Sequence, residues 1–263
     1  FNLNVHYLIA NEAGASVYSA SPLAKEELPG LDVTLRGAVS IARRIQDPLA
    51  ELVKIDPKSL GVGQYQHDVD QKELAKSLSA VVESCANHVG VDLNTASPTL
   101  LTFVAGINAT IAKNIVAYRN QHGKFKNREE LLRIPRLGKT VFTQCAGFLR
   151  IKQGTNPLDN TSVHPESYPL AEKILAQLGF SLESLQDKHQ LERLQARIQE
   201  CAPEKLAAAL SAGVPTVRDI LAALAKPGRD PREDLPPPIP RKQLIKLSDL
   251  VPGTIVKGTV HNI

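Results

Sequence analysis

Two short stretches of the sequence carry residues that suit them to holding a phosphate group. The first runs from Leu101 to Asn108, and the second runs from Leu131 to Gly138. Each predicts a short helix, a tight hairpin with one glycine, and a second helix. A hairpin that enters a helix leaves the first backbone N–H groups unpaired, and their partial positive charge favours a phosphate oxygen.

The residues expected to contact phosphate lie in the two hairpins and just after them. Glycine allows a positive φ in the turn and a close approach of another backbone. Asn108 is expected to tolerate the left-handed conformation where a second glycine would stand. The alternative is an ordinary turn that only packs two helices, and the presence of two copies favours binding. The predicted contacts are Gly106, Ile107, Asn108, Lys113, Arg136, Leu137, Gly138 and Lys139.

Basic residues are concentrated around these hairpins. Between Gly106 and Lys152 the sequence has ten Lys and Arg residues and only two acidic residues, Glu129 and Glu130. The local net charge is therefore +8, in a chain whose net charge is +4. Such a surface attracts a phosphate backbone and releases its counterions. A solvated helical face would account for 124–128 equally well, but less well for Lys139. The ten are Lys113, Arg119, Lys124, Lys126, Arg128, Arg133, Arg136, Lys139, Arg150 and Lys152.

The two stretches resemble the helix-hairpin-helix family, whose pattern is apolar-x-x-apolar-Pro-Gly-apolar-Gly-x-x-x-Ala. Members usually hold a nucleic-acid backbone without reading its sequence. The copies depart from the pattern, because Asn108 stands at the second glycine and Arg136 at the first. Each hairpin therefore keeps one of the two family glycines. The resemblance implies binding to nucleic acid without sequence preference.

Composition indicates a globular protein of two or three small domains. The chain has 263 residues, with 43% hydrophobic and 22% charged residues. No run of about eighteen apolar residues occurs, so no membrane span is expected. Three separated cysteines without a Cys-x-x-Cys pattern predict a reducing, cytoplasmic setting. The start at Phe1, the absence of methionine and an end within a β pattern predict a central piece of a longer protein.

The elements that must position the hairpins are mainly helices. A buried strand is expected at 5–10, and a helix at 35–54 that Pro48 divides and whose apolar stripe includes Leu35 and Ile45. An amphipathic helix is predicted at 70–87, with Leu74, Leu78, Val81, Val82 and Cys85 on one face. Residues 153–169 are expected to be a linker. Residues 169–225 are expected to be helical, with apolar stripes that include Ile174, Leu194 and Leu224. A weak third hairpin pattern occurs at Gly213, where plain helix packing is favoured.

Several blocks of the sequence resemble the Tex family of bacterial transcription accessory proteins. The blocks are residues 11–21, 35–44, 46–58, 61–68, 145–150, 156–159 and 252–260. The resemblance implies a multidomain, mainly α protein with four parts. These are the C-terminal part of an α/β RNase H-like (YqgF) domain at 1–68, a linking helix and an all-α tandem helix-hairpin-helix domain at 69–152, a helical, helix-hairpin-helix-like or mixed domain at 153–235, and a Pro-rich linker with the first strand of a β-barrel OB fold at 236–263.

The RNase H-like resemblance raises the question of catalysis. Such nucleases hold two divalent ions with carboxylates, and Glu12 and Asp47 are the candidates here. A further acid is expected before Phe1, and a site that lacks it should not support catalysis. The alternatives are a turn residue for Glu12 and a helix-start cap for Asp47. We therefore predict no enzyme activity, no metal and no cofactor, with Mg²⁺ relevant only if the RNase H-like domain of a full-length parent is active.

The leading hypothesis is a module that binds the backbone of RNA, DNA or both within a transcription accessory or elongation factor. One alternative is a metal-dependent nuclease in the full-length parent. A second is an adaptor whose helices at 70–88 and 169–225 dock on RNA polymerase or ribosome-associated machinery. Residues 91–97 and 115–119 also resemble competence-type DNA receptors, but those carry a membrane anchor and lack the flanking blocks. Strand type remains open, because the hairpins would contact a backbone common to all these nucleic acids.

Overall fold

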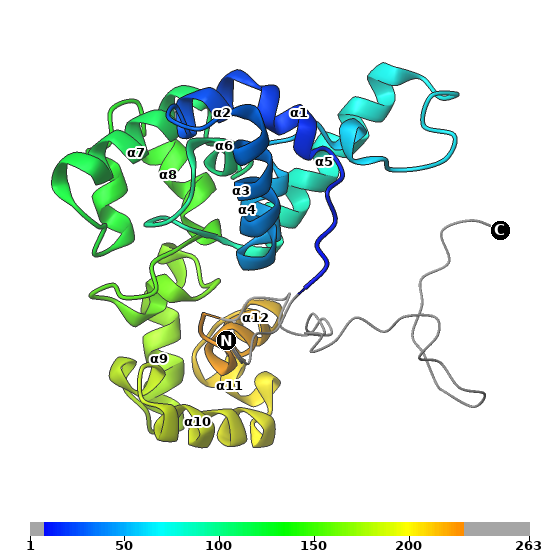
Figure 1. Ribbon diagram of the computed structural model, residues 1–263. Coiled ribbons are helices and arrows are strands. Elements are labelled where there is room, and N and C mark those ends of the chain that lie inside the picture. The colour runs from blue at the N-terminus through cyan, green and yellow to red at the C-terminus, as the bar shows by residue number, and fades with distance from the viewer. Residues whose placement is uncertain (1–7, 229–263) are drawn as a thin grey trace, which may run out of the picture.

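Regular structure in residues 8–228, the part that the computed structural model describes, is almost entirely helical (Figure 1). Two short strands occur there, β1 (Val91–Asp92) and β2 (Leu149–Arg150), and they pair in parallel. Residues 8–10 form no strand, and the rest of the strand expected at 5–10 lies outside the described residues. The β pattern after Leu250 also lies outside them.

The N-terminal part is a small group of helices with little apolar core. Its elements are α1 (Ala15–Ala20), α2 (Pro22–Glu27), α3 (Val33–Gln46), α4 (Pro48–Leu52) and the 3-10 helix η1 (Pro57–Leu60). The break between α3 and α4 confirms the predicted effect of Pro48. Tyr18, Ala24 and Ile55 form the local core, and Leu60 packs against it.

Helix α3 buries a polar face instead of the apolar stripe that the sequence suggested. Its buried residues are Arg36, Ser40 and Arg44, whereas Leu35 is 49% exposed and Ile45 is 44% exposed. The Arg44 guanidinium group donates hydrogen bonds of 2.8 Å to two backbone carbonyls of the 11–13 turn. These charge-assisted bonds orient the helix and leave its apolar stripe at the surface.

Helix α5 (Gln71–Val89) confirms the predicted helix, and part of its predicted apolar face is half-buried. Asp70 caps the helix and accepts hydrogen bonds from the backbone N–H groups of Lys72 and Glu73 in the first turn. Ala86 is the one buried residue of the helix, whereas Val81 is 57% exposed and Cys85 is also exposed. Leu74, Leu78 and Val82 of the expected apolar face are half-buried, so only one edge of that face is uncovered by the described residues.

Residues 91–150, which we call the first hairpin unit, contain both predicted hairpins. The unit comprises β1, α6 (Pro98–Leu101), α7 (Ala109–His122), η2 (Arg128–Arg133), α8 (Lys139–Cys145), η3 (Ala146–Phe148) and β2. Pairing of Val91 with Leu149 brings the two ends of the unit together. The core includes the fully buried Cys145, and burial raises the pKa of its thiol to about 12.

Residues 157–225, the second hairpin unit, lie below the first in Figure 1. The unit comprises η4 (Pro157–Asn160), η5 (Pro165–Ser167), α9 (Tyr168–Leu178), η6 (Leu182–Leu185), α10 (Lys188–Glu200), α11 (Pro203–Ala209) and α12 (Val214–Ala225). The predicted apolar stripes form its core, with Ile174, Leu194 and Leu224 fully buried. No single described helix is long and apolar enough to cross a membrane; α11 and α12 reach that length only together, with a 113° bend.

The expectation that residues 153–169 form a linker is wrong. This segment contains two 3-10 helices, and it buries Leu158, Asp159, Thr161 and Val163. Polar composition predicted a solvated connection. Instead, Leu158 and Val163 join the core of the second hairpin unit, while Asp159 and the carbonyls of Thr161 and Val163 bind Arg128 of the first. The two units are therefore joined by an ordered contact.

Candidate nucleic-acid interface

The two predicted hairpins have the same backbone conformation, thirty residues apart. The first position of each turn is left-handed, with φ of 81° at Gly106 and 70° at Arg136. The next residue, Ile107 or Leu137, is buried and anchors the turn in the core. Glycine meets the left-handed requirement without strain, whereas Arg136 adopts it despite its side chain.

The second family glycine position is not left-handed in either hairpin. Asn108 has φ −92° and Gly138 has φ −83°, and both are extended residues that precede a helix. The expectation that Asn108 replaces a left-handed glycine is therefore wrong. Its side chain instead accepts a hydrogen bond of 3.0 Å from the Ile111 N–H. Asn108 caps α7 in this way, while Gly138 provides no side-chain cap for α8.

Unpaired backbone N–H groups follow each cap. Within the described residues, the N–H groups of Ala109 and Thr110 have no acceptor in the first hairpin. The N–H groups of Lys139, Thr140 and Val141 have none in the second hairpin, because Gly138 lacks a capping side chain. The first two residues after each cap are exposed, so these donors are open to a ligand.

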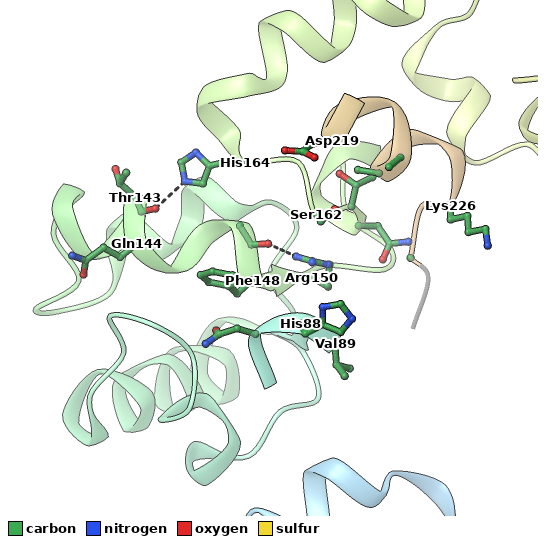
Figure 2. A pocket seen from close by; sticks show the side chains of 17 residues that line it. His88, Val89, Thr143, Gln144, Phe148, Arg150, Ser162, His164, Asp219 and Lys226 are labelled. Carbon is green, nitrogen blue, oxygen red and sulfur yellow. Dashed lines mark hydrogen bonds between the residues drawn. The ribbon is translucent and has the colours of Figure 1, made fainter. Parts of the chain in front are cut away.

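The hairpins are braced against each other by side chains at equivalent positions. Asn114, six residues after the first cap, donates a hydrogen bond of 3.0 Å to the Pro135 carbonyl. Gln144 on α8 (Figure 2), six residues after the second cap, lies against Gly106, where an added Cβ would be 2.9 Å from Gln144 Oε1. The sequence analysis missed both residues, although the thirty-residue repeat could have revealed them. The reciprocal contacts place both turns together.

Three of the ten basic residues use their side chains to hold backbone carbonyls of the fold. Arg119 donates hydrogen bonds to the backbone carbonyls of Leu93 and Ala96, and Arg150 donates to the Gly147 carbonyl. Arg128 is 1% exposed. The expectation that the whole local charge faces phosphate is therefore wrong for these three. Seven remain exposed: Lys113, Lys124, Lys126, Arg133, Arg136, Lys139 and Lys152.

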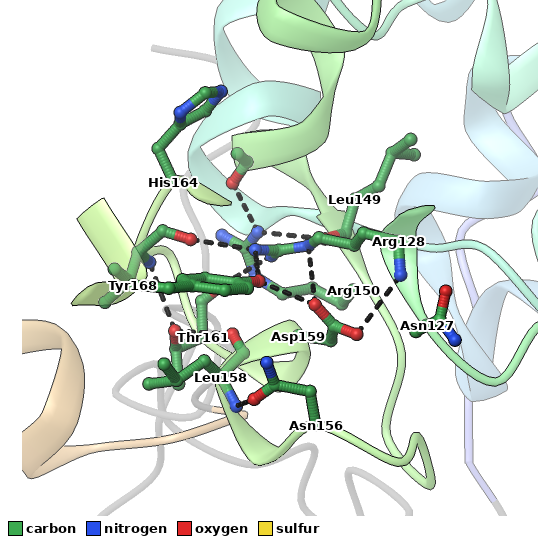
Figure 3. Close-up of polar contacts among 12 residues, drawn as sticks. Asn127, Arg128, Leu149, Arg150, Asn156, Leu158, Asp159, Thr161, His164 and Tyr168 are labelled. Carbon is green, nitrogen blue, oxygen red and sulfur yellow. Dashed lines mark hydrogen bonds and ion pairs between the residues drawn. The ribbon is translucent and has the colours of Figure 1, made fainter. Parts of the chain in front are cut away.

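Arg128 joins the two hairpin units from inside (Figure 3). Its guanidinium group donates to the carbonyls of Leu149, Thr161 and Val163 at 2.7–2.9 Å and to the Tyr168 hydroxyl at 2.7 Å. Its backbone N–H donates to Asp159 at 3.1 Å. Burial raises the pKa of Asp159, whereas the Tyr168 hydrogen bond and the Arg128 charge act in the opposite direction.

The two candidate acids, Glu12 and Asp47, lie in a turn and at the start of a helix. Glu12 is exposed, and its carbonyl accepts the Ala15 N–H in a turn. The Asp47 carboxylate caps α4 by accepting the Ala50 N–H at 3.1 Å. Among residues 8–228, no three side chains of His, Cys, Asp or Glu are grouped so that they could hold a metal ion.

The second hairpin unit contains two more turns of the same conformation. Gly179 has φ 84° and Ser211 has φ 52°, and each is followed two residues later by an extended cap, Ser181 or Gly213. Only the second of these turns gave a sequence signal. The first lay hidden because Ser181 replaces the second family glycine.

Three parts of the chain match known families. Residues 86–150 match the helix-hairpin-helix motif family, and residues 156–232 match a helix-hairpin-helix (HHH) domain family. Residues 1–46 match the Tex protein YqgF-like domain. The match over 156–232 corrects the expectation of plain helix packing around Gly213, because that turn belongs to a second helix-hairpin-helix domain.

Several curated proteins are similar to the chain along its length. The transcriptional accessory protein Tex of Neisseria gonorrhoeae is 53% identical over 261 residues, which cover 99% of this chain and 33% of that protein. Protein YhgF of Escherichia coli (strain K12) is 56% identical over 97% of this chain and 32% of its own length. The human S1 RNA-binding domain-containing protein 1 is 41% identical over 99% of this chain and 31% of its own length. The chain spans about a third of each.

Proposed function

Because the chain belongs to the Tex family, we propose that it binds the backbone of nucleic acid through the paired hairpins of the first hairpin unit, as part of a transcription accessory protein. The observation that carries the proposal is the pair of braced, exposed turns with unpaired N–H groups and adjacent cations. Three features thus converge on one ligand, an anionic backbone.

Each hairpin has a defined part in this mechanism. One phosphate would accept hydrogen bonds from the N–H groups of Ala109 and Thr110, and another from those of Lys139 and Thr140. The exposed side chains of Lys113, Lys139 and Arg136 would add charge. Backbone amides and ammonium groups contact phosphate without touching base edges, so binding would not depend on base sequence.

A protein-contact role is a second candidate, and the exposed face of α5 favours it. Val81 is 57% exposed and Cys85 is exposed on a nineteen-residue helix whose one buried residue is Ala86. Exposed apolar side chains on one helix face are typical of protein contacts. We propose RNA polymerase or ribosome-associated machinery as the partner of this face. Association with such a partner that persists at high salt would separate this role from phosphate binding.

The test of the nucleic-acid proposal is a fluorescence-anisotropy titration of the chain with matched single- and double-stranded DNA and RNA across a salt series. We expect an affinity that falls steeply as salt rises and that is the same for unrelated sequences. The preferred strand type would then define the substrate. Absence of binding at low salt, or affinity independent of salt, would contradict phosphate contact by the hairpins.

A further inference from the structure

A cavity of about 720 Å³ lies where α5, the end of the first hairpin unit and α12 meet (Figure 2). His88 lines it from α5 and Arg150 from β2. Ser162 lines it from the start of the second hairpin unit, and Asp219 and Lys226 from the α12 side. The cavity is separate from the hairpin turns and takes residues from both hairpin units. Its volume is in the range of pockets that hold small molecules.

Arg150 is the unusual group of this cavity. One of its terminal nitrogens donates to the backbone carbonyls of Gly147 and Leu149. Its other nitrogens have no acceptor, and no carboxylate lies within 4 Å of it, among the described residues. Burial and the neighbouring Arg128 charge lower the pKa of Arg150 to about 10, so it is still charged at neutral pH.

The surroundings do not compensate this charge. The nearest buried acid is Asp159, whose carboxylate already accepts from the Arg128 N–H and the Tyr168 hydroxyl. Asp159 lies 4.0 Å from Arg128, and Arg150 has no carboxylate of its own within 4 Å among the described residues. Arg150 is partly buried, and an anion brought from outside would supply the opposite charge that this guanidinium group lacks.

We propose that this cavity binds a phosphomonoester, carried either by a free mononucleotide or by the 5′ end of a nucleic-acid strand. The Arg150 fork suits the two oxygens of a phosphate group. Lys226 and the Ser162 hydroxyl line the same cavity and are exposed, so they can reach the ligand. Phe148 and Val89 provide apolar lining for the nucleoside. Neither hairpin is needed, so the proposal goes beyond the one above.

Calorimetric titration of the full chain with adenosine 5′-monophosphate and with inorganic phosphate tests the site. A matched pair of oligonucleotides, with and without a 5′ phosphate, tests the strand-end source by anisotropy. We expect the monophosphate to bind, or the 5′ phosphate to raise oligonucleotide affinity severalfold. Monophosphate binding alone identifies a free nucleotide, and a strand-end effect alone identifies the terminus; either supports the proposal.

Substitutions distinguish the cations of this cavity from cations elsewhere on the surface. Lys226→Glu and Arg150→Lys should each weaken the phosphomonoester effect about tenfold, whereas Lys205→Glu, an exposed lysine outside the cavity, should not. Because Lys226 is exposed, its variant should fold even if Arg150→Lys does not. Phosphomonoester binding should persist in the double variant Lys113→Glu with Lys139→Glu. The cavity can therefore be tested even if the hairpins do not contact phosphate. The proposal would be overturned if the monophosphate does not bind and the 5′ phosphate does not raise oligonucleotide affinity. It would also be overturned if Lys205→Glu weakens phosphomonoester binding as much as Lys226→Glu does. Inorganic phosphate that binds as tightly as the monophosphate would overturn the nucleotide part of the proposal.

Discussion

The two hairpin units share a turn conformation but differ in charge. Each of their four turns has a left-handed residue, an apolar residue and an extended cap. The first unit has nine Lys and Arg residues against three Asp and Glu, whereas the second has six against nine. Nucleic acid is drawn to concentrated positive charge. The shared turn therefore explains how the helices pack in both units. The difference in charge indicates that the first unit is the one suited to binding nucleic acid.

The second unit also differs from the first in its donors and in the cation beside its turn. Pro215, two residues after the Gly213 cap, has no N–H to offer. Arg218 stands five residues after that cap, as Lys113 does in the first hairpin, but it is paired with Glu204 at 2.7 Å. In the other turn, the Ser181 N–H donates to Ser184 at 3.2 Å. We infer that the second unit is a scaffold that supports the first.

The strongest test of this division is Arg128, a cation of the first unit that supports the fold. Arg128→Met should lower the free energy of unfolding by about 3–5 kcal/mol, because it removes a buried charge from Asp159 and leaves several carbonyls without a donor. Urea unfolding followed by circular dichroism measures this loss. Arg133→Met, at an exposed site, should change stability by less than about 0.5 kcal/mol. Similar losses in both variants would contradict the structural role of Arg128.

Charge reversal compares the two units directly. Lys113→Glu with Lys139→Glu should weaken binding at low salt at least about tenfold, roughly 1.4 kcal/mol. The salt slope should fall by about two, one for each lost phosphate contact. The matched double variant Lys188→Glu with Lys205→Glu alters two exposed lysines of the second unit. An equal effect of the two double variants in the anisotropy assay would remove the distinction between the units.

The left-handed position allows a comparison within the first unit. Gly106→Ala should lower the free energy of unfolding by about 1–2 kcal/mol, since φ is 81° and the new Cβ would meet Gln144. Arg136→Gly, at the equivalent position, should raise stability by up to about 1 kcal/mol by relieving the same strain, while weakening nucleic-acid binding. Denaturant titration of both variants measures the two changes in the free energy of unfolding, which should have opposite signs. Destabilisation by Arg136→Gly would show that its side chain has a packing role.

Much of the helical structure was predictable because its signals are local. The break at Pro48, the helix at 70–87 and the two hairpins follow from residues only a few positions apart. The apolar stripes of the second unit, such as Ile174 and Leu194, also became its core. Periodicity and turn residues determine these features before any distant contact forms.

Burial of the polar residues was not predictable in the same way. Arg128 is enclosed by carbonyls at Thr161 and Val163, more than thirty residues away, so its charge was counted with the surface lysines. Helix α3 turns Arg44 inward because its partners lie in the 11–13 turn. Which charged residue is buried depends on which carbonyls surround it, and sequence spacing does not contain that information.

The smallest expected effect is also the one that best isolates the backbone N–H groups. Asn108→Gly removes a cap, which should lower stability by only a few tenths of a kcal/mol. It also frees the Ile111 N–H and removes the Asn108 side-chain oxygen from the place where a phosphate would lie. Affinity should therefore rise about twofold to threefold, a gain within the usual value of one hydrogen bond.

The reciprocal change, Gly138→Asn, should add a cap to α8, raise stability slightly and lower affinity by a similar factor. Anisotropy and denaturant titration of both variants would show stability and affinity changing in opposite directions. Such opposition is expected only if the same N–H groups serve either the cap or the phosphate. If affinity instead follows stability in both variants, the hairpins contribute to binding through their rigidity, and the lysine side chains alone contact the backbone.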